Sequence, residues 1–269
     1  MDNIAGFDVL IYFFGQIETL MLIFVRVIGF MMFAPVLSGQ NMWTMGRLFV
    51  SFYVAIALFM SGAVGAIYYI DTTPGYVFLL ITEFLVGMVI SYVTFLVFNS
   101  VLFSGQLIDF QMGFMMVNIM DPLTQRQVPV TGNVLYVGMS AILIATGGLH
   151  AMFMTFFYSY RVLPIGVANL VGNQELVWYI LVLMMQSIVV GVRIAMPIIA
   201  SMMLVNVALG VMVKTVPQMN VFVVGMPLKI FLGLILLWLV VTPNMDFIFW
   251  ELFEMAHVAM MEVTWGMQP

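Results

Sequence analysis

The sequence predicts an all-α, polytopic membrane protein, and three observations support that fold class. Of the 269 residues, 64% are hydrophobic and 7% are charged, and the mean hydropathy is +1.18. Soluble domains carry about 25% charged residues, so this chain has too little charge to cover a surface facing water. Its apolar residues also fall into segments of 20 or more, which is the length that spans a bilayer as a helix.

The charged residues and the missing cysteines exclude several function classes. Seven Lys and Arg stand against twelve Asp and Glu, giving a net charge of −5 and no basic patch for nucleic acid. With no Cys in the chain, disulfides, thiol nucleophiles and Cys-ligated metals are ruled out. The start of the chain, Met1-Asp2-Asn3, is acidic and does not resemble a signal peptide, so we expect the first apolar segment to be retained.

Short connectors rich in Gly, Pro and polar residues separate the apolar segments, and we interpret the chain as one domain. The candidate spanning segments are Val9–Pro35, Leu48–Ile70, Tyr76–Ser104, Asn133–Ser159, Val177–Val213 and Val221–Val241.

The few cations of the connectors predict an orientation. Arg47, Arg126 and Lys214 fall in the first, third and fifth connectors, which the positive-inside rule places in the cytoplasm. Arg161 lies in the fourth connector, on the opposite side.

Two segments depart from a simple spanning helix. Val177–Val213 would be roughly 55 Å long at 1.5 Å per residue, and Pro197 in its middle predicts a break or bend. The C-terminal 246–269 has apolar residues at helical spacing beside Glu251 and Glu254. We expect it to be an amphipathic tail that docks or lies at the interface.

No catalytic or cofactor-binding motif is present, so we expect neither enzymatic activity nor a bound cofactor or metal. The chain lacks a His-Glu-x-x-His, a Gly-x-Ser-x-Gly and a phosphate-binding loop. His150 and His257 stand apart from each other, and a lone His in an apolar segment is more often a packing residue than a metal ligand.

Charges within apolar segments are the default functional candidates of a membrane protein. They are Glu18, Arg26, Glu83, Asp109 and Arg193. A proton- or ion-coupled transporter would bring some of them together at the midplane, whereas an assembly subunit would use them in ion pairs. Their mixed signs favour pairing, and we expect too few partners within the chain for four of them. We therefore predict that some of Glu18, Arg26, Glu83 and Arg193 pair across subunits.

Methionine is abundant, with 28 residues, and one Met cluster lies in an unusual stretch. The segment 105–122 mixes helix-weakening Gly105 and Gly113 with polar and bulky apolar residues and ends at Asp121-Pro122. An irregular apolar connector cannot face lipid, because its backbone would lack hydrogen bonds. It should be buried in protein or line a pore.

The residues resemble the FliR family, an export-gate component of flagellar type III secretion with injectisome counterparts. The resemblance covers nearly the whole chain. It rests on Gly105-Gln106 through Gly113-Phe114 to Asp121-Pro122, on Ser159-Tyr160-Arg161-Val162-Leu163-Pro164-Ile165-Gly166 after Gly147-Gly148-Leu149-His150, and on Asn206 through Pro217-Gln218-Met219-Asn220-Val221-Phe222 to Ile230.

The resemblance implies kinked helical hairpins packed in a helical assembly with FliP and FliQ homologues. FlhB and FlhA homologues would lie nearby, in the bacterial inner membrane at the flagellar basal body. It implies a FliP-like part over 1–175, a FliQ-like hairpin over 176–245 that turns at Pro217, and the tail over 246–269. The loop over about 105–122 would be a plug that closes the pore, made by Phe110, Met112, Phe114, Met115 and Met116.

The leading interpretation is a gate for unfolded flagellar subunits, whose pore needs a deformable lining that Met and Phe supply. The alternative is a secondary transporter of small solutes, which requires repeated halves and convergent polar groups at the midplane. We find neither feature in the sequence.

Overall fold

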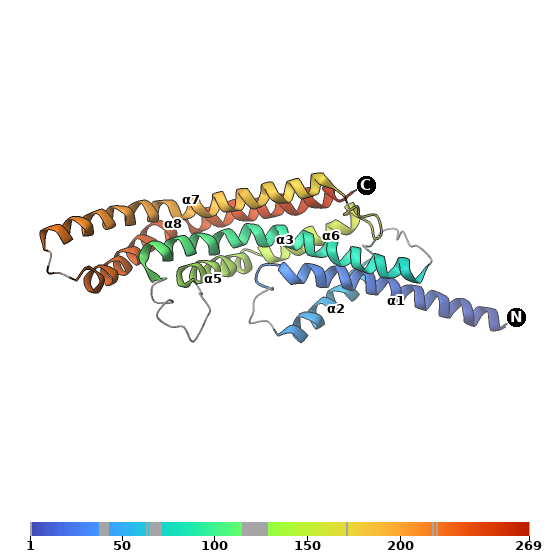
Figure 1. Cartoon of the computed structure of the whole chain (residues 1–269). Helices are drawn as coiled ribbons and strands as arrows, with labels where there is room; N and C mark the ends of the chain where they lie inside the picture. The colour runs from blue at the N-terminus through green and yellow to red at the C-terminus, as the bar shows by residue number, and fades with distance from the viewer. Residues whose placement is uncertain are drawn as a thin grey trace. The chain divides into compact units, whose positions relative to one another are not determined.

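The computed structural model of the chain describes residues 2–37, 43–62, 64, 72–114, 129–170, 172–216, 218 and 220–268. Within these residues the secondary structure is helical and no strand occurs, which confirms the all-α class (Figure 1). The helices are α1 (Asp2–Phe33), α2 (Thr44–Met60), α3 (Thr73–Met112), α5 (Val130–Ala145), α6 (Gly148–Val162), α7 (Gln174–Thr215) and α8 (Val221–Gly266).

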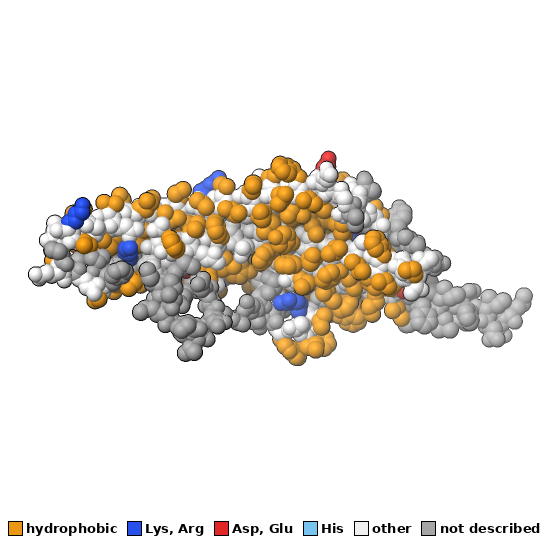
Figure 2. All heavy atoms as spheres, viewed as in Figure 1, with side chains coloured by type: hydrophobic (Ala, Val, Ile, Leu, Met, Phe, Trp, Pro, Cys, Tyr) orange, Lys and Arg blue, Asp and Glu red, His pale blue; other side chains and the backbone are white. Residues whose placement is uncertain are grey.

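Three of these helices are long and apolar enough to cross a membrane, namely α3, α7 and α8. The pair of α5 and α6, which is bent by 73° at its junction, raises the possible number of spans to four. Hydrophobic side chains cover much of the face drawn in Figure 2, and charged side chains on it are few. The polytopic membrane class is therefore confirmed, with fewer long spans than the six segments predicted.

Two predicted segments end or divide at glycines. The segment 133–159, which was predicted as one span, is split into α5 and α6 at Gly147, whose φ is +73°. The predicted segment 48–70 contains α2, which ends at Met60 just before Gly62 with φ +63°. A residue in the left-handed region ends a helix, and glycine adopts that conformation without a steric penalty.

Prolines, in contrast, do not end the long helices. The helix α7 continues through Pro197, so the predicted interruption there is wrong, while a bend within a continuous helix stays a prediction. The helix α8 continues through Pro227 and Pro243 to Gly266, so residues 246–266 of the predicted tail are the last part of α8, and their role as an amphipathic tail stays a prediction. Packing explains this continuity, because Phe249, Leu252 and other residues beyond Pro243 are fully buried.

The chain divides into two compact units. Unit 1 comprises residues 1–95, 149–183 and 255–269, and unit 2 comprises 96–148 and 184–254. This division differs from the predicted boundary near residue 175, because α3, α7 and α8 each contribute to both units. The assignment of FliP-like and FliQ-like parts stays a prediction.

Each unit has its own packed core. In unit 1, Phe30 of α1 stacks on Phe156 of α6 with ring centroids 4.2 Å apart, and Phe156 meets Tyr160 edge-on at 5.6 Å. In unit 2, Met139 of α5 and Met202 of α7 are completely buried. The helices α7 and α8 of this unit lie side by side as a hairpin (Figure 1).

Candidate functional site

A buried ion pair joins α1 to α3 in unit 1. The Nε of Arg26 donates a hydrogen bond to Oε2 of Glu83, and both side chains are completely buried. A lone buried charge is strongly destabilising, whereas a paired and hydrogen-bonded charge is tolerated. The groups around this pair determine whether its remaining donors and acceptors have hydrogen-bond partners.

Three further groups surround the pair, and all come from the segment that ends α6 and follows it. The Nη1 of Arg26 donates to the carbonyl oxygen of Leu163 at 3.0 Å, and the guanidinium carbon lies 4.4 Å from the centroid of the Tyr160 ring. The second carboxylate oxygen of Glu83 accepts from the backbone N–H of Gly166 at 3.1 Å. We call Arg26, Glu83, Tyr160 and the backbone groups of Leu163 and Gly166 the polar node.

The polar node holds a turn in place, and that turn carries the second stretch of the family resemblance. Leu163 and Ile165 are completely buried beside the node. Only the Nη2 of Arg26 makes no hydrogen bond to the residues that the structure describes. The node therefore fixes α1, α3 and the residues after α6 to one another.

Two glycines let α1 and α3 approach closely enough for this pair to form. A Cβ at Gly87 would collide with the carbonyl oxygen of Arg26, and one at Gly29 would collide with the carbonyl oxygen of Phe84. Small residues at such crossings let two helix backbones pack against each other, a recurrent device in membrane proteins. The glycines thus bring the charged residues together.

The prediction that the apolar-segment charges lack partners within the chain is wrong for three of the four. Arg26 and Glu83 pair with each other, and Arg193 of α7 pairs with Glu251 of α8 at 2.9 Å in unit 2. Glu18 is half-buried, and its backbone carbonyl accepts from the Tyr76 hydroxyl at 3.1 Å. Sequence spacing could not reveal partners separated by 57 or 58 positions.

The Arg193–Glu251 pair has surroundings unlike those of the polar node. The Arg193 side chain is 66% exposed and the Glu251 side chain 35%. Exposed apolar residues flank the pair, including Met196 on α7 and Trp250 on α8. This surface of unit 2 therefore combines exposed guanidinium donors with apolar side chains.

Two of the residues proposed as a plug, Phe110 and Met112, lie in the last turn of α3, and they differ in burial. Met112 is completely buried in unit 2, in the space beside Gly233 of α8, where a Cβ would collide with its side chain. Phe110 is 67% exposed, and Phe114 is half-buried. Met115, Met116 and Pro217 lie outside the described residues.

The two helices that flank this loop are tied together by Asp109. Its carboxylate oxygens accept the backbone N–H of Thr131, in the first turn of α5, at 3.2 and 3.1 Å. The first amides of a helix lack partners within the helix, and a carboxylate there is favourable. Asp109 is one of the charges whose mixed signs predict ion pairs, and its role as a helix cap is not evident from the sequence.

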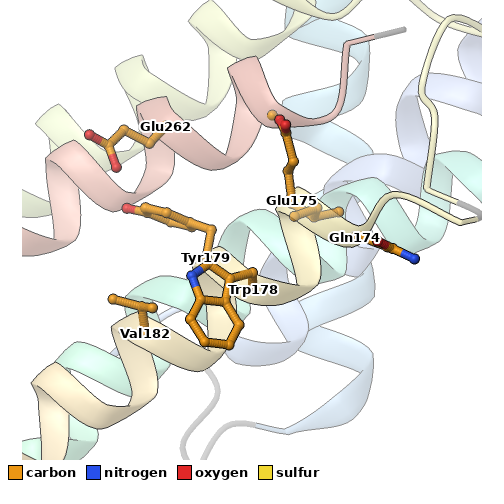
Figure 3. Close-up of a pocket in the computed structure, with 8 residues that line it drawn as sticks. Gln174, Glu175, Trp178, Tyr179, Val182 and Glu262 are labelled. Carbon is orange, nitrogen blue, oxygen red and sulfur yellow. The ribbon is translucent and has the colours of Figure 1, made fainter.

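A cavity of about 740 Å³ in unit 1 lies between the start of α7 and the end of α8. Figure 3 shows Tyr179 of α7 extending toward Glu262 of α8, and the Tyr179 hydroxyl hydrogen-bonds that carboxylate. Glu175 and Trp178 line the same cavity. Among the described residues no group of three or more His, Asp or Glu could hold a metal ion.

Comparison with known proteins connects this architecture to one family. The family model described as bacterial export proteins, family 1, matches residues 17–255. The flagellar biosynthetic protein FliR of Bacillus subtilis (strain 168) is 30% identical over 225 residues, which are 81% of this chain and 83% of that protein. The chain belongs to the FliR family of bacterial export proteins.

Two further proteins are similar to the chain over two thirds or more of their own lengths. The flagellar biosynthetic protein FliR of Escherichia coli (strain K12) is 24% identical over 240 residues, covering 86% of this chain and 88% of that protein. The Yop proteins translocation protein T of Yersinia pestis is 26% identical over 176 residues, covering 65% of this chain and 67% of that protein. The predicted family resemblance is confirmed, and the chain is a membrane component of bacterial protein export.

Proposed function

We propose that the chain is a subunit of the flagellar type III export gate in the bacterial inner membrane. With FliP and FliQ homologues, and with FlhB and FlhA homologues nearby, it forms the pore that passes unfolded flagellar subunits. The observation that carries this proposal is the match of a bacterial export family over residues 17–255, on a chain whose long apolar helices suit a membrane.

The surface of unit 2 supports an assembly role. The Arg193 guanidinium is two-thirds exposed and lies among apolar side chains. Exposing it to lipid hydrocarbon would cost free energy, whereas a protein partner that offers carboxylates or carbonyls would stabilise it. Arg193 uses Nη1 for Glu251, and its exposed side chain leaves further donors for such a partner. Arg26 and Glu83 then contribute to assembly indirectly, by fixing the shape of unit 1, whereas Glu18 remains a candidate for a pair across subunits.

The pore plug is the finer part of the proposal. In this proposal the pore axis is closed by the side chains of Phe110, Phe114, Met115 and Met116. Met112 holds the end of α3 against α8. Burial of each Phe or Met side chain is worth about 1.5–3 kcal/mol, which favours a closed pore that these side chains fill. Met side chains repack readily, so a driven polypeptide can still displace them.

The test is to express the chain with an affinity tag in a strain that lacks its own copy. We expect FliP and FliQ homologues to co-purify and flagellar subunits to be secreted. A solute transporter would purify as a single kind of chain, and a chain recovered without such partners would refute the gate assignment. Replacing Phe110, Met115 and Met116 with Ala tests the plug separately. We expect an assembled gate that conducts ions, and an assembled gate that stays ion-tight would refute the plug alone.

A further inference from the structure

A groove in unit 1 combines apolar walls with a single cation. It lies between the end of α2 and α6 and has a volume of about 400 Å³, within the range of about 300–1,000 Å³ of ligand pockets. Its lining residues are Ala57, Leu58, Ser61, Met154, Phe157, Tyr158 and Arg161.

Among the described residues that line this groove, Arg161 is the only charged one, and the described part of the chain makes no use of its guanidinium. It is exposed in the last turn of α6, and no ion pair or hydrogen bond joins its side chain to any of the described residues. Its position suits the carbonyl end of the α6 dipole, which explains why a cation is tolerated there. A dipole does not explain why an apolar groove opens beside it.

The helix α2 has the features of a helix that faces lipid. It has 17 residues, a length of about 26 Å that is close to the thickness of a hydrocarbon core. Phe49, Tyr53 and Met60 are between 71% and 80% exposed. After Arg47, no charged residue occurs up to the end of the helix.

Both ends of α2 carry the anchors typical of a membrane interface. Trp43 and Arg47 lie at its start, and Tyr158 and Arg161 lie beside its end. Aromatic side chains and Lys or Arg gather at the two boundaries of a bilayer, where the cations reach the headgroups. Arg161 is thus placed at headgroup depth, with apolar walls leading away from it.

We propose that this groove binds an anionic phospholipid, with the Arg161 guanidinium on the phosphate and one acyl chain along Leu58, Met154 and Phe157. Basic pockets between transmembrane helices are known to hold anionic lipid headgroups through the charge of Lys or Arg. An acidic side chain of a partner protein would match Arg161 alone, whereas a phospholipid matches both the guanidinium and the apolar walls. The proposal is independent of the gate assignment.

The first experiment uses native mass spectrometry of the purified complex in mild detergent, titrated with phosphatidylglycerol or phosphatidylethanolamine. One cation near an anionic lipid is worth about five-fold in affinity, so the variant Arg161→Gln should lose about that much of the preference for phosphatidylglycerol. Arg161→Lys keeps the charge and should keep most of the preference. Lys214→Gln, which removes an exposed cation at the end of α7, is the matched control and should change nothing.

A second experiment needs no variant and therefore does not depend on the folding of Arg161→Gln. Photoactivatable phosphatidylglycerol should crosslink to peptides containing 57–61 or 154–161 in the unaltered complex, more strongly than its phosphatidylethanolamine counterpart. Equal labelling by both lipids, or labelling that avoids both peptides, would overturn the proposal. So would an Arg161→Gln complex that keeps its lipid preference, or one that loses a partner chain while its lipids are unchanged.

Discussion

In unit 1, Arg26 and Glu83 are completely enclosed, and hydrogen bonds from Gly166 and to Leu163 complete their surroundings. In unit 2, Arg193 and Glu251 form a pair of the same chemistry, yet the Arg193 side chain is two-thirds exposed among apolar residues. The stability of the fold depends on both members of a buried pair, because removing either one leaves an uncompensated charge. An exposed pair contributes little to the chain that carries it and leaves hydrogen-bonding groups for others.

The largest effect is expected at the polar node. Glu83→Leu leaves Arg26 buried without its carboxylate and should destabilise the chain by about 3–5 kcal/mol. We expect little protein in the membrane fraction and a large fall in the melting temperature of any complex recovered. The double variant Arg26→Met/Glu83→Leu removes both charges and should recover much of the loss. If Glu83→Leu alone melts like the unaltered complex, the pair does not stabilise unit 1.

The next prediction compares the loss of stability expected from truncating Met112 and Phe110 at the end of α3. Met112 is completely buried, so Met112→Ala should cost about 2–5 kcal/mol. Phe110 is mostly exposed in the chain alone, so Phe110→Ala should change the stability of the isolated chain by no more than about 0.5 kcal/mol. Thermal melting of the isolated chain measures both, and melting of the purified complex measures whether Phe110 becomes buried on assembly. A large loss from Phe110→Ala would mean that this side chain is buried in the assembly, as the plug requires, and ion conductance would then distinguish closure from packing.

A smaller loss of stability is expected where α1 and α3 approach each other at Gly29 and Gly87, next to the polar node. Gly87→Ala places a methyl group against the carbonyl oxygen of Arg26 and should destabilise by about 1–3 kcal/mol. Gly210→Ala is the matched control, because nothing lies within 4 Å of a Cβ there in the same type of helix. The control should be neutral or stabilising by up to about 1 kcal/mol. Equal melting temperatures for the two variants would show that the α1–α3 approach tolerates a side chain.

The two regions were not equally accessible to sequence reasoning. Composition was enough for the membrane class and the helical fold, because both depend on sums over many residues. Glu83 and Arg26 were recognised as exceptional charges, but their pairing depends on a helix crossing that no local pattern encodes. The capping role of Asp109 was likewise hidden, since its partner Thr131 lies 22 positions away. No local pattern showed that the predicted tail over 246–269 continues α8, because that continuity through Pro243 depends on the packing of Phe249 and Leu252.

The smallest effect on the chain itself is expected at Arg193, although its effect on assembly should be clear. Arg193→Gln should change the melting temperature of unit 2 only slightly, since exposed ion pairs are worth about 0–1 kcal/mol. Recovery of the complex with FliP and FliQ homologues should nevertheless fall, because a partner loses its guanidinium contact. Glu254→Gln removes an exposed charge on α8, at the last residue of unit 2, and serves as the control.

The charge-swapped variant Arg193→Glu/Glu251→Arg decides which contact matters. It restores an ion pair within the chain but presents the opposite arrangement of charges to any partner. If assembly depends on the partner contact, the swapped variant should assemble as poorly as Arg193→Gln or worse, since like charges across an interface repel. If it assembles normally while Arg193→Gln does not, the pair acts only within unit 2. In that case the exposed pair and the buried pair would serve the same structural purpose, and the contrast between the two units would not hold.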